Sequence, residues 1–219
     1  MEWVKGEIIG RGSFGTVNLA TPRRDCSEIP SLMAVKSSLV SQSAMLMKEK
    51  EILTHLNGCP QILRCFGDDL TIENGVKIYN VFLEFASKGN LSQLIKSSGS
   101  SISESDIRRY TKSITQGLNY IHQHGYVHSD IKPQNILLCS STGKQSEVKI
   151  ADFGLAKKTG QKSRVLGLIG TPLYMSPESI CCNENEAPSD VWALGISRDT
   201  WRIIRRREGF LEEVFGERS

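Results

Sequence analysis

Ten residues, Tyr126–Asn135, place a carboxylate, an ammonium, an imidazole and a carboxamide between two apolar segments. A predicted helix ends before them at Gly125, and an apolar, strand-like run, Ile136–Leu138, follows them. Polar side chains on a short loop between packed elements are typical of active sites. Asp130 and Asn135 can face one point, the first as a proton acceptor and the second as an oxygen donor to a metal. A solvated turn is the alternative for any single aspartate of this kind.

A second carboxylate, in Asp152-Phe153-Gly154, follows seventeen residues after that loop, and a glycine-rich segment precedes it. Gly10, Gly12 and Gly15 form the pattern GxGxxG, which in a dinucleotide-binding fingerprint runs from a strand into a helix. Here the glycines run into Thr16–Ala20, which alternates and is β-branched. The pattern therefore predicts two strands and a tight turn, whose glycine backbone can lie close over phosphates. A plain glycine-rich hairpin is the alternative.

Lys36 ends a short apolar run that begins at Leu32, and a lysine at a strand end is commonly a solvated edge residue. The next segment, residues 42–57, indicates a different role because its apolar residues recur at helical spacing. The stripe consists of Met45, Ile52, Leu53 and Leu56. Glu49 falls on the same face, and a carboxylate turned toward an interior needs a cationic partner. Lys36 is the nearest candidate, so the sequence predicts a Lys36–Glu49 ion pair.

The remaining pattern predicts a small antiparallel sheet over residues 1–84 and a mainly helical part after it. Residues 61–67 and 77–85 have the pattern of two further strands, joined by a polar turn over 68–75, and residues 86–90 form a connector of small residues.

In the helical part, a capping-box serine, Ser103, opens a helix that closes at Gly125. Further along, the sequence predicts a strand over 147–151, a mobile basic loop over 156–170, a turn-rich anchor over 170–178 and a helix with Ser189 at its N-cap.

Charge and cysteine content exclude several functional classes. The formal net charge is +3, which gives no strong basic field for binding nucleic acid. The six cysteines are scattered without a CxxC pair, which fits reduced thiols better than disulfides or a zinc site. Charged residues within 1–20 argue against a signal peptide, and no apolar run is long enough to span a bilayer. We expect a soluble protein that binds neither nucleic acid nor membrane and is cytoplasmic, with the nucleus as a second compartment.

In their order and spacing these segments resemble the signature motifs of the eukaryotic protein kinase domain over residues 6–197. The start Glu2–Gly6 and the run Asp190–Gly195 are similar to plant MAP kinase kinase kinases of the MEKK-like group. The resemblance implies an α+β, two-lobed fold, with a β-rich nucleotide-binding lobe over 1–84 and a partial helical lobe over 85–197. It also implies ATP and Mg²⁺ as cofactors.

The same resemblance assigns catalytic roles. Asp130 would accept the proton of the substrate hydroxyl, and Lys132 would sit on the γ-phosphate of ATP. Thr171 would bond near Asp130 and help to seat the substrate. Lys36, paired with Glu49, would hold the α- and β-phosphates.

Asn135 and Asp152 would hold Mg²⁺, the backbone of Glu84 and Ala86 would hydrogen-bond the adenine, and Leu83 would guard the back of the nucleotide pocket. The complete set of nucleotide contacts that the resemblance implies is Ile9, Gly10, Arg11, Gly12, Ser13, Phe14, Gly15, Val17, Ala34, Lys36, Leu83, Glu84, Ala86 and Leu137.

Lys132, two residues after Asp130, and the run Gly170–Pro172 resemble the serine/threonine class rather than tyrosine-specific members. The resemblance therefore implies transfer of the γ-phosphate of ATP to serine or threonine of a protein substrate, a MAP kinase kinase in a signalling cascade. The alternative is a catalytically impaired, kinase-derived module that binds nucleotide or a partner and acts as a decoy or regulator.

Two places depart from the family pattern. Ser129 stands where many members have an arginine that meets a phosphate on the activation loop, so we expect that phosphorylation of Thr159 or Ser163 is not the dominant on-switch. Eleven of the last 22 residues are charged. We expect a truncated helical lobe followed by a divergent tail over 198–219. A native short form whose basic run, Arg205–Arg207, binds a partner is the alternative.

Overall fold

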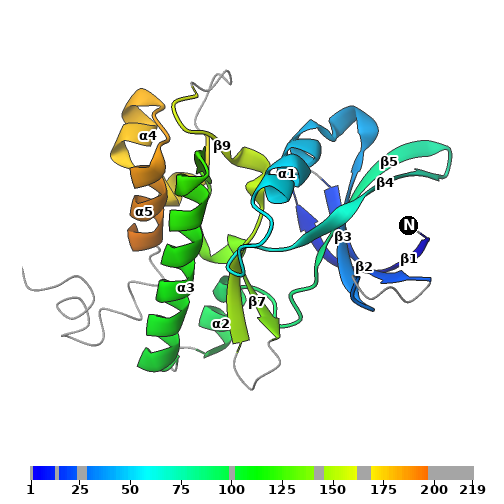
Figure 1. Cartoon of the computed structure of the whole chain (residues 1–219), viewed down its shortest axis with the longest axis horizontal. Helices are drawn as coiled ribbons and strands as arrows, with labels where there is room; N and C mark the ends of the chain where they lie inside the picture. The colour runs from blue at the N-terminus through cyan, green and yellow to red at the C-terminus, as the bar shows by residue number, and fades with distance from the viewer. Residues whose placement is uncertain are drawn as a thin grey trace, which may run out of the picture.

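The computed structural model describes residues 2–12, 15–23, 29–98, 102–140, 146–161 and 169–196. A twisted antiparallel sheet with one helix beside it leads into a mainly helical part (Figure 1). The expected α+β class, with a sheet lobe and a helical lobe, is confirmed, while the division of the chain at residue 84 stays a prediction. The predictions made for Ser13, Phe14, Ser163 and the tail over 198–219 lie outside the described residues.

The sheet is built around its central strand. Its strands are β1 (Trp3–Gly12), β2 (Gly15–Pro22), β3 (Met33–Leu39), β4 (Cys65–Glu73) and β5 (Val76–Glu84), in the order β1-β2-β3-β5-β4. On β3, Met33 and Val35 pack with Phe82 in a small core on one face of the sheet. Ala34 joins the main core on the other face. Because side chains alternate along a strand, Lys36 lies on the face of Ala34, toward the rest of the molecule.

The hairpin of β4 and β5 differs from the sequence prediction. Residues 68–73 continue β4 rather than forming a turn, and the turn itself is Asn74-Gly75, with φ values of 51° and 79°. Positive φ at both central residues is what a two-residue hairpin turn requires. The polar strand residues find partners within the sheet, since the Tyr79 hydroxyl donates to Asp68 at 3.0 Å. The polar composition of 68–73 therefore misled the prediction. Residues 61–64 are not in a regular strand either.

The predicted glycine-rich hairpin is confirmed, because β1 and β2 pair from Trp3–Pro22 to Gly12–Gly15. Gly15 has a φ of 149°, and a Cβ atom at this residue would lie 1.9 Å from the carbonyl oxygen of Ser37 on β3. Glycine is thus required at this corner for its conformation and for the close approach of two backbones.

We expect Gly15→Ala to lower the free energy of unfolding by about 2 kcal/mol, because the side chain would force a strained backbone and displace β3. Gly12→Ala is the matched control, since a Cβ atom at Gly12 meets no atom of the described residues within 4 Å. Urea denaturation of both variants beside the wild type measures the difference. Equal stability of the two variants would contradict the tight contact at Gly15.

One helix carries the predicted inward carboxylate. Helix α1 (Ala44–His55) is two residues shorter at each end than the predicted segment, and it contacts β4 and η3 (Phe153–Leu155). Its buried side chains are Leu46, Glu49, Ile52 and Leu53. Met45, which was expected on this stripe, is only partly buried, and Leu46 takes that place.

The helical part is organised on α3 (Glu104–Gln123), whose N-cap Ser103 accepts a hydrogen bond from the Asp106 amide at 3.1 Å. The expected helix is therefore confirmed. Its apolar face, Ile107, Tyr110, Ile114, Leu118 and Ile121, is buried.

The other elements are α2 (Leu91–Ser98), β6 (Tyr126–Val127), η2 (Pro133–Asn135), β7 (Ile136–Ser140), β8 (Ser146–Ile150), β9 (Lys157–Lys158), η4 (Pro172–Tyr174), α4 (Pro177–Cys182) and α5 (Ala187–Ile196). No helix in these described ranges is long and apolar enough to cross a membrane.

The start of α5 corrects one prediction. The helix begins at Ala187, so Ser189 lies in its first turn and is not the N-cap. The Ser189 hydroxyl instead accepts a hydrogen bond from the backbone amide of Glu186 at 3.3 Å. A side chain in the first turn that reaches back to the residue before the helix satisfies one of the amide groups that a helix start leaves without a partner.

Candidate active site

The loop that follows β6 brings four of the predicted catalytic and metal-binding residues together. Asp130 is 8% exposed, and its Oδ2 accepts hydrogen bonds from Lys132 Nζ at 2.7 Å and from Asn135 Nδ2 at 3.0 Å. Its Oδ1 accepts from the Thr171 hydroxyl at 2.7 Å. Lys132 Nζ also donates to the Thr171 hydroxyl oxygen at 2.8 Å. Asp130 therefore lies at the centre of a compact polar network that a distant residue, Thr171, completes.

A second polar centre joins three segments of the chain around Lys36. The Lys36 Nζ atom lies 2.7 Å from Glu49 Oε2 on α1 and 2.9 Å from Asp152 Oδ1 after β8. The predicted Lys36–Glu49 ion pair is thus present, and Glu49 is only 2% exposed. A buried carboxylate of this kind is tolerated because its charge is compensated. Asp152 comes to the same ammonium with its backbone in the left-handed region, at φ 65°.

In the polar centre around Lys36, the pKa of each charged group depends on the charges of its neighbours. Burial favours the neutral form of Lys36, but the carboxylates of Glu49 and Asp152 outweigh it and raise the pKa of the ammonium. Burial also favours neutral Asp152, but Lys36 outweighs it and lowers the pKa of that carboxyl. The Lys36 contribution to stability is therefore present below about pH 10.4 and lost as the pH rises through its folded pKa. The Asp152 contribution is present above about pH 3.9 and lost as the pH falls through its folded pKa.

Asn135 and Asp152 fit the role of Mg²⁺ ligands. The Asn135 amide nitrogen donates to Asp130, so its amide oxygen is turned away from that carboxylate. The Asp152 side chain is 42% exposed, and its Oδ1 bonds Lys36. Within the described ranges, no group of three or more His, Cys, Asp or Glu side chains could hold a metal alone. Mg²⁺ is commonly held by one or two carboxylates together with substrate phosphates, which matches this donor set.

Five predicted nucleotide contacts belong to one apolar cluster. Ala34 and Leu83 are buried in the main core and pair across β3 and β5. Val17, Ala86 and Leu137 pack against this core and stay partly exposed. These residues come from both lobes, and the partly exposed Val17, Ala86 and Leu137 leave apolar surface on which a planar ring could lie.

The chain that leaves β5 offers backbone groups beside this surface. The Glu84 amide already donates to the Arg64 carbonyl at 2.9 Å, and the Glu84 carboxylate accepts from Lys149 at 2.8 Å. Among the described residues the Ala86 amide has no hydrogen-bond acceptor, whereas its carbonyl accepts from Gly89 at 3.1 Å. The remaining predicted contacts, Ile9, Gly10, Arg11 and Gly12, lie on β1, with Gly15 at the start of β2. Their roles stay predictions.

Sequence reasoning gave no role to the Asp190 carboxylate, which holds in place residues 128–135, the loop between β6 and β7 that we call the catalytic loop. Asp190 is 1% exposed on α5, and its carboxylate accepts hydrogen bonds from the backbone amides of His128 and Ser129, both at 2.9 Å. His122 Nε2 lies 2.8 Å from the same carboxylate. The His128 ring in turn bonds the Ala151 carbonyl at 3.1 Å, beside Asp152. The sequence signals were the resemblance of the run Asp190–Gly195 to the kinase family and an acidic residue before an apolar run, neither of which identifies the two backbone amides as its partners.

Ser129 has a different environment from the one that an arginine would need. Its backbone lies in the left-handed region, at φ 65°, and its hydroxyl is buried without a hydrogen-bond partner among the described residues. This side chain carries no charge, and it donates no hydrogen bond to residues 153–161, the described part of the segment that follows Asp152.

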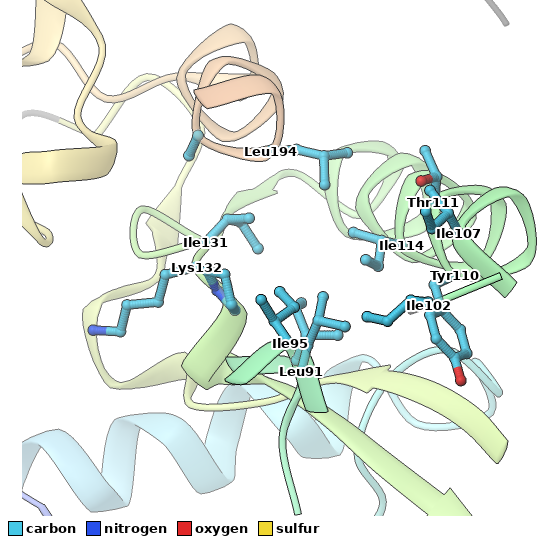
Figure 2. Close-up of a pocket in the computed structure, with 13 residues that line it drawn as sticks. Leu91, Ile95, Ile102, Ile107, Tyr110, Thr111, Ile114, Ile131, Lys132 and Leu194 are labelled. Atoms are coloured by element: carbon cyan, nitrogen blue, oxygen red, sulfur yellow. The ribbon is translucent and has the colours of Figure 1, made fainter. Parts of the chain in front are cut away.

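An apolar pocket lies beside the catalytic loop, lined by residues of α2, α3 and α5 (Figure 2). Ile131 and the aliphatic stem of Lys132 form part of its wall, while the Lys132 ammonium points away from it. Leu91, Ile95, Ile107, Ile114 and Leu194 complete much of the lining. A pocket of this composition does not suit a charged nucleotide, and Lys132 is the one lining residue that it shares with the networks around Asp130 and Lys36.

Comparison with known proteins agrees with this geometry. The family model described as protein kinase domain matches residues 3–202. Mitogen-activated protein kinase kinase kinase 20 of Arabidopsis thaliana is 46% identical over 200 residues, which cover 89% of this chain and 57% of that protein. Mitogen-activated protein kinase kinase kinase 17 of the same plant is 37% identical over 198 residues, covering 89% and 50%. Mitogen-activated protein kinase kinase kinase A of Dictyostelium discoideum is 34% identical over 206 residues, covering 89% and 20%. The chain thus spans about half the length of the two plant relatives.

Proposed function

Because the chain belongs to the protein kinase domain family, we propose that it is an ATP- and Mg²⁺-dependent protein serine/threonine kinase that phosphorylates a MAP kinase kinase. The observation that carries the proposal is the network of Asp130, Lys132 and Thr171, 2.7–2.8 Å apart, beside the Lys36–Asp152 pair. A base, a positive charge and a hydroxyl converge where a substrate hydroxyl would meet a phosphate.

Phosphoryl transfer needs positioning and charge stabilisation more than covalent chemistry from the protein. The Asp130 carboxylate would orient the substrate hydroxyl and accept its proton. The Lys132 ammonium, which already lies on this carboxylate, would offset the negative charge of the transferred group. Thr171, bonded to both, would hold the approaching serine or threonine in line.

The polar centre around Lys36 would hold ATP, the phosphate donor. Lys36, kept charged by Glu49, would bind phosphate oxygens of ATP, and the apolar surface of Val17, Ala34 and Leu137 would take the adenine. Mg²⁺, held by Asn135 and Asp152, would supply positive charge to the phosphates.

The substrate class rests on two further supports. Lys132 and Thr171, the residues on which the resemblance to serine/threonine kinases rests, lie 2.8 Å apart at the Lys132 ammonium and the Thr171 hydroxyl. The relatives are named MAP kinase kinase kinases, and that name describes an action on MAP kinase kinases. We propose the same substrate class for this chain and a cytoplasmic location.

We expect the chain to transfer label from γ-labelled ATP to serine or threonine of a catalytically inactive MAP kinase kinase, and to label a generic basic protein at least tenfold more slowly. Phosphoamino-acid analysis of the product measures the residue type. Equal rates on the two acceptors would contradict the substrate proposal, and Mg-ATP binding without transfer to either would favour a nucleotide-binding regulator.

A further inference from the structure

The residues that follow Asp152 and η3 turn back beside the catalytic loop. Strand β9 (Lys157–Lys158) pairs with β6 (Tyr126–Val127), which directly precedes His128. The Thr159 amide donates to the Gly125 carbonyl at 2.9 Å, and the Gln161 amide donates to the Lys158 carbonyl at 3.1 Å. The turn Lys157–Gln161 is therefore fixed against the chain that enters the catalytic loop.

One carboxylate holds this turn from the other side. Glu186 Oε1 accepts hydrogen bonds from Lys157 Nζ at 2.8 Å and from the Gly160 amide at 3.2 Å, and Oε2 lies 3.3 Å from the same amide. Lys157 Nζ also donates to the Gln161 carbonyl at 2.9 Å. The Lys157 side chain is 13% exposed and that of Glu186 is 40% exposed. The Glu186 carboxylate thus binds both the Lys157 ammonium and the Gly160 amide of one turn. These combined contacts hold the turn more strongly than an exposed ion pair alone would.

Glu186 is itself fixed by the start of α5. The Ser189 amide donates to the Glu186 carbonyl at 2.8 Å, and the Ser189 hydroxyl accepts from the Glu186 amide at 3.3 Å. The next residue, Asp190, binds the amides of His128 and Ser129. The first turn of α5 therefore holds the catalytic loop through Asp190, and the residue before the helix, Glu186, holds the turn Lys157–Gln161.

We propose that Glu186 is a positioning residue for phosphoryl transfer, because its carboxylate keeps the turn Lys157–Gln161 beside the catalytic loop without a phosphate. The inference rests on the proposed kinase activity and adds to it a mode of regulation. Ser129 offers no cation to a phosphate, and the group that holds the turn is an anion. A phosphate on Thr159, next to the Gly160 amide, would add like charge near Glu186 and weaken its hold.

The test uses the whole chain with Glu186→Gln, Lys157→Met and the double variant. Glu184→Gln is the matched control, because Glu184 is exposed and lies two residues from Glu186. We expect amide hydrogen exchange in residues 157–161 to be about tenfold faster in each single variant. The rise in exchange rate in the double variant should be smaller than the product of the two single effects, since both substitutions remove the Lys157–Glu186 contact, and Lys157→Met also removes the bond to the Gln161 carbonyl. We also expect kcat to fall about 3- to 10-fold with an unchanged KM for ATP, whereas Glu184→Gln behaves as the wild type.

Each other outcome counts against the inference. Unchanged exchange in Glu186→Gln would show that the carboxylate does not hold the turn. Faster exchange with unchanged kcat would show that the turn is held but that its position does not matter for transfer. A several-fold gain of kcat in Thr159→Glu would show that negative charge promotes the active arrangement. A wild-type chain that transfers no phosphate refutes the proposed function, while the exchange rates still report the contact of Glu186 with the turn.

Discussion

Asp130→Asn is expected to lower kcat by about 10²- to 10⁴-fold, because it removes the proposed base and retains the size of the side chain. The amide oxygen can still accept hydrogen bonds from Lys132 and Asn135 in place of Oδ2, while the amide nitrogen takes the place of Oδ1 and can donate to the Thr171 hydroxyl oxygen. The loop should therefore keep its shape, and steady-state kinetics measure the loss.

Nucleotide binding separates this effect from misfolding. Asp130→Asn should still be stabilised by Mg-ATP in a thermal-shift measurement, since Lys36 and Asp152 are intact. Asp152→Ala should lose that stabilisation, because it removes a proposed Mg²⁺ ligand. If Asp130→Asn lost the thermal shift as well, its low kcat would no longer identify Asp130 as the base.

The second large effect is expected for Lys36→Met, which should lower kcat/KM by about 10²- to 10³-fold. The same change leaves Glu49, only 2% exposed, without its cation. Removing one partner of a buried ion pair costs about 3–5 kcal/mol, so the free energy of unfolding should fall by a similar amount. Urea denaturation and steady-state kinetics measure the two effects.

A second substitution distinguishes the two roles of Lys36. Lys36→Met/Glu49→Gln no longer leaves a charge on the buried Glu49 side chain, and the Asp152 carboxylate that still lacks its cation is 42% exposed, so the variant should regain most of the lost stability. Its activity should remain low, because the ammonium proposed to bind the phosphates is still absent. The account of this ion pair would be wrong if the double variant were no more stable than Lys36→Met, or if it regained activity.

The local sequence pattern was sufficient to predict a residue's role where that role follows from the helix or strand on which the residue lies. Glu49 lies on the buried stripe of α1, so its need for a cation could be predicted, and Lys36 supplies it. The hairpin at Gly15 could be predicted because the residues after it alternate. The contact of Thr171 with Asp130 came only from the family resemblance, since the two residues lie 41 positions apart.

Other features could not be predicted because their partners are backbone groups of distant residues. Asp190 binds two amides of the catalytic loop, and Glu186 binds the Gly160 amide, so neither partner is visible as a residue type. Ser189 was expected to cap α5 because serine is common at the N-cap. The helix begins at Ala187 instead, and the Ser189 hydroxyl accepts a hydrogen bond from the Glu186 amide. The residues 68–73 were expected to form a turn because they are polar, yet they extend a hairpin.

The most direct test of the proposed function is the initial rate of γ-phosphate transfer to an inactive MAP kinase kinase by residues 1–219, beside Asp130→Asn, at saturating Mg-ATP. We expect transfer to serine or threonine by the wild type and about 1% of that rate or less in the variant. Equal incorporation of label in the two reactions would contradict it.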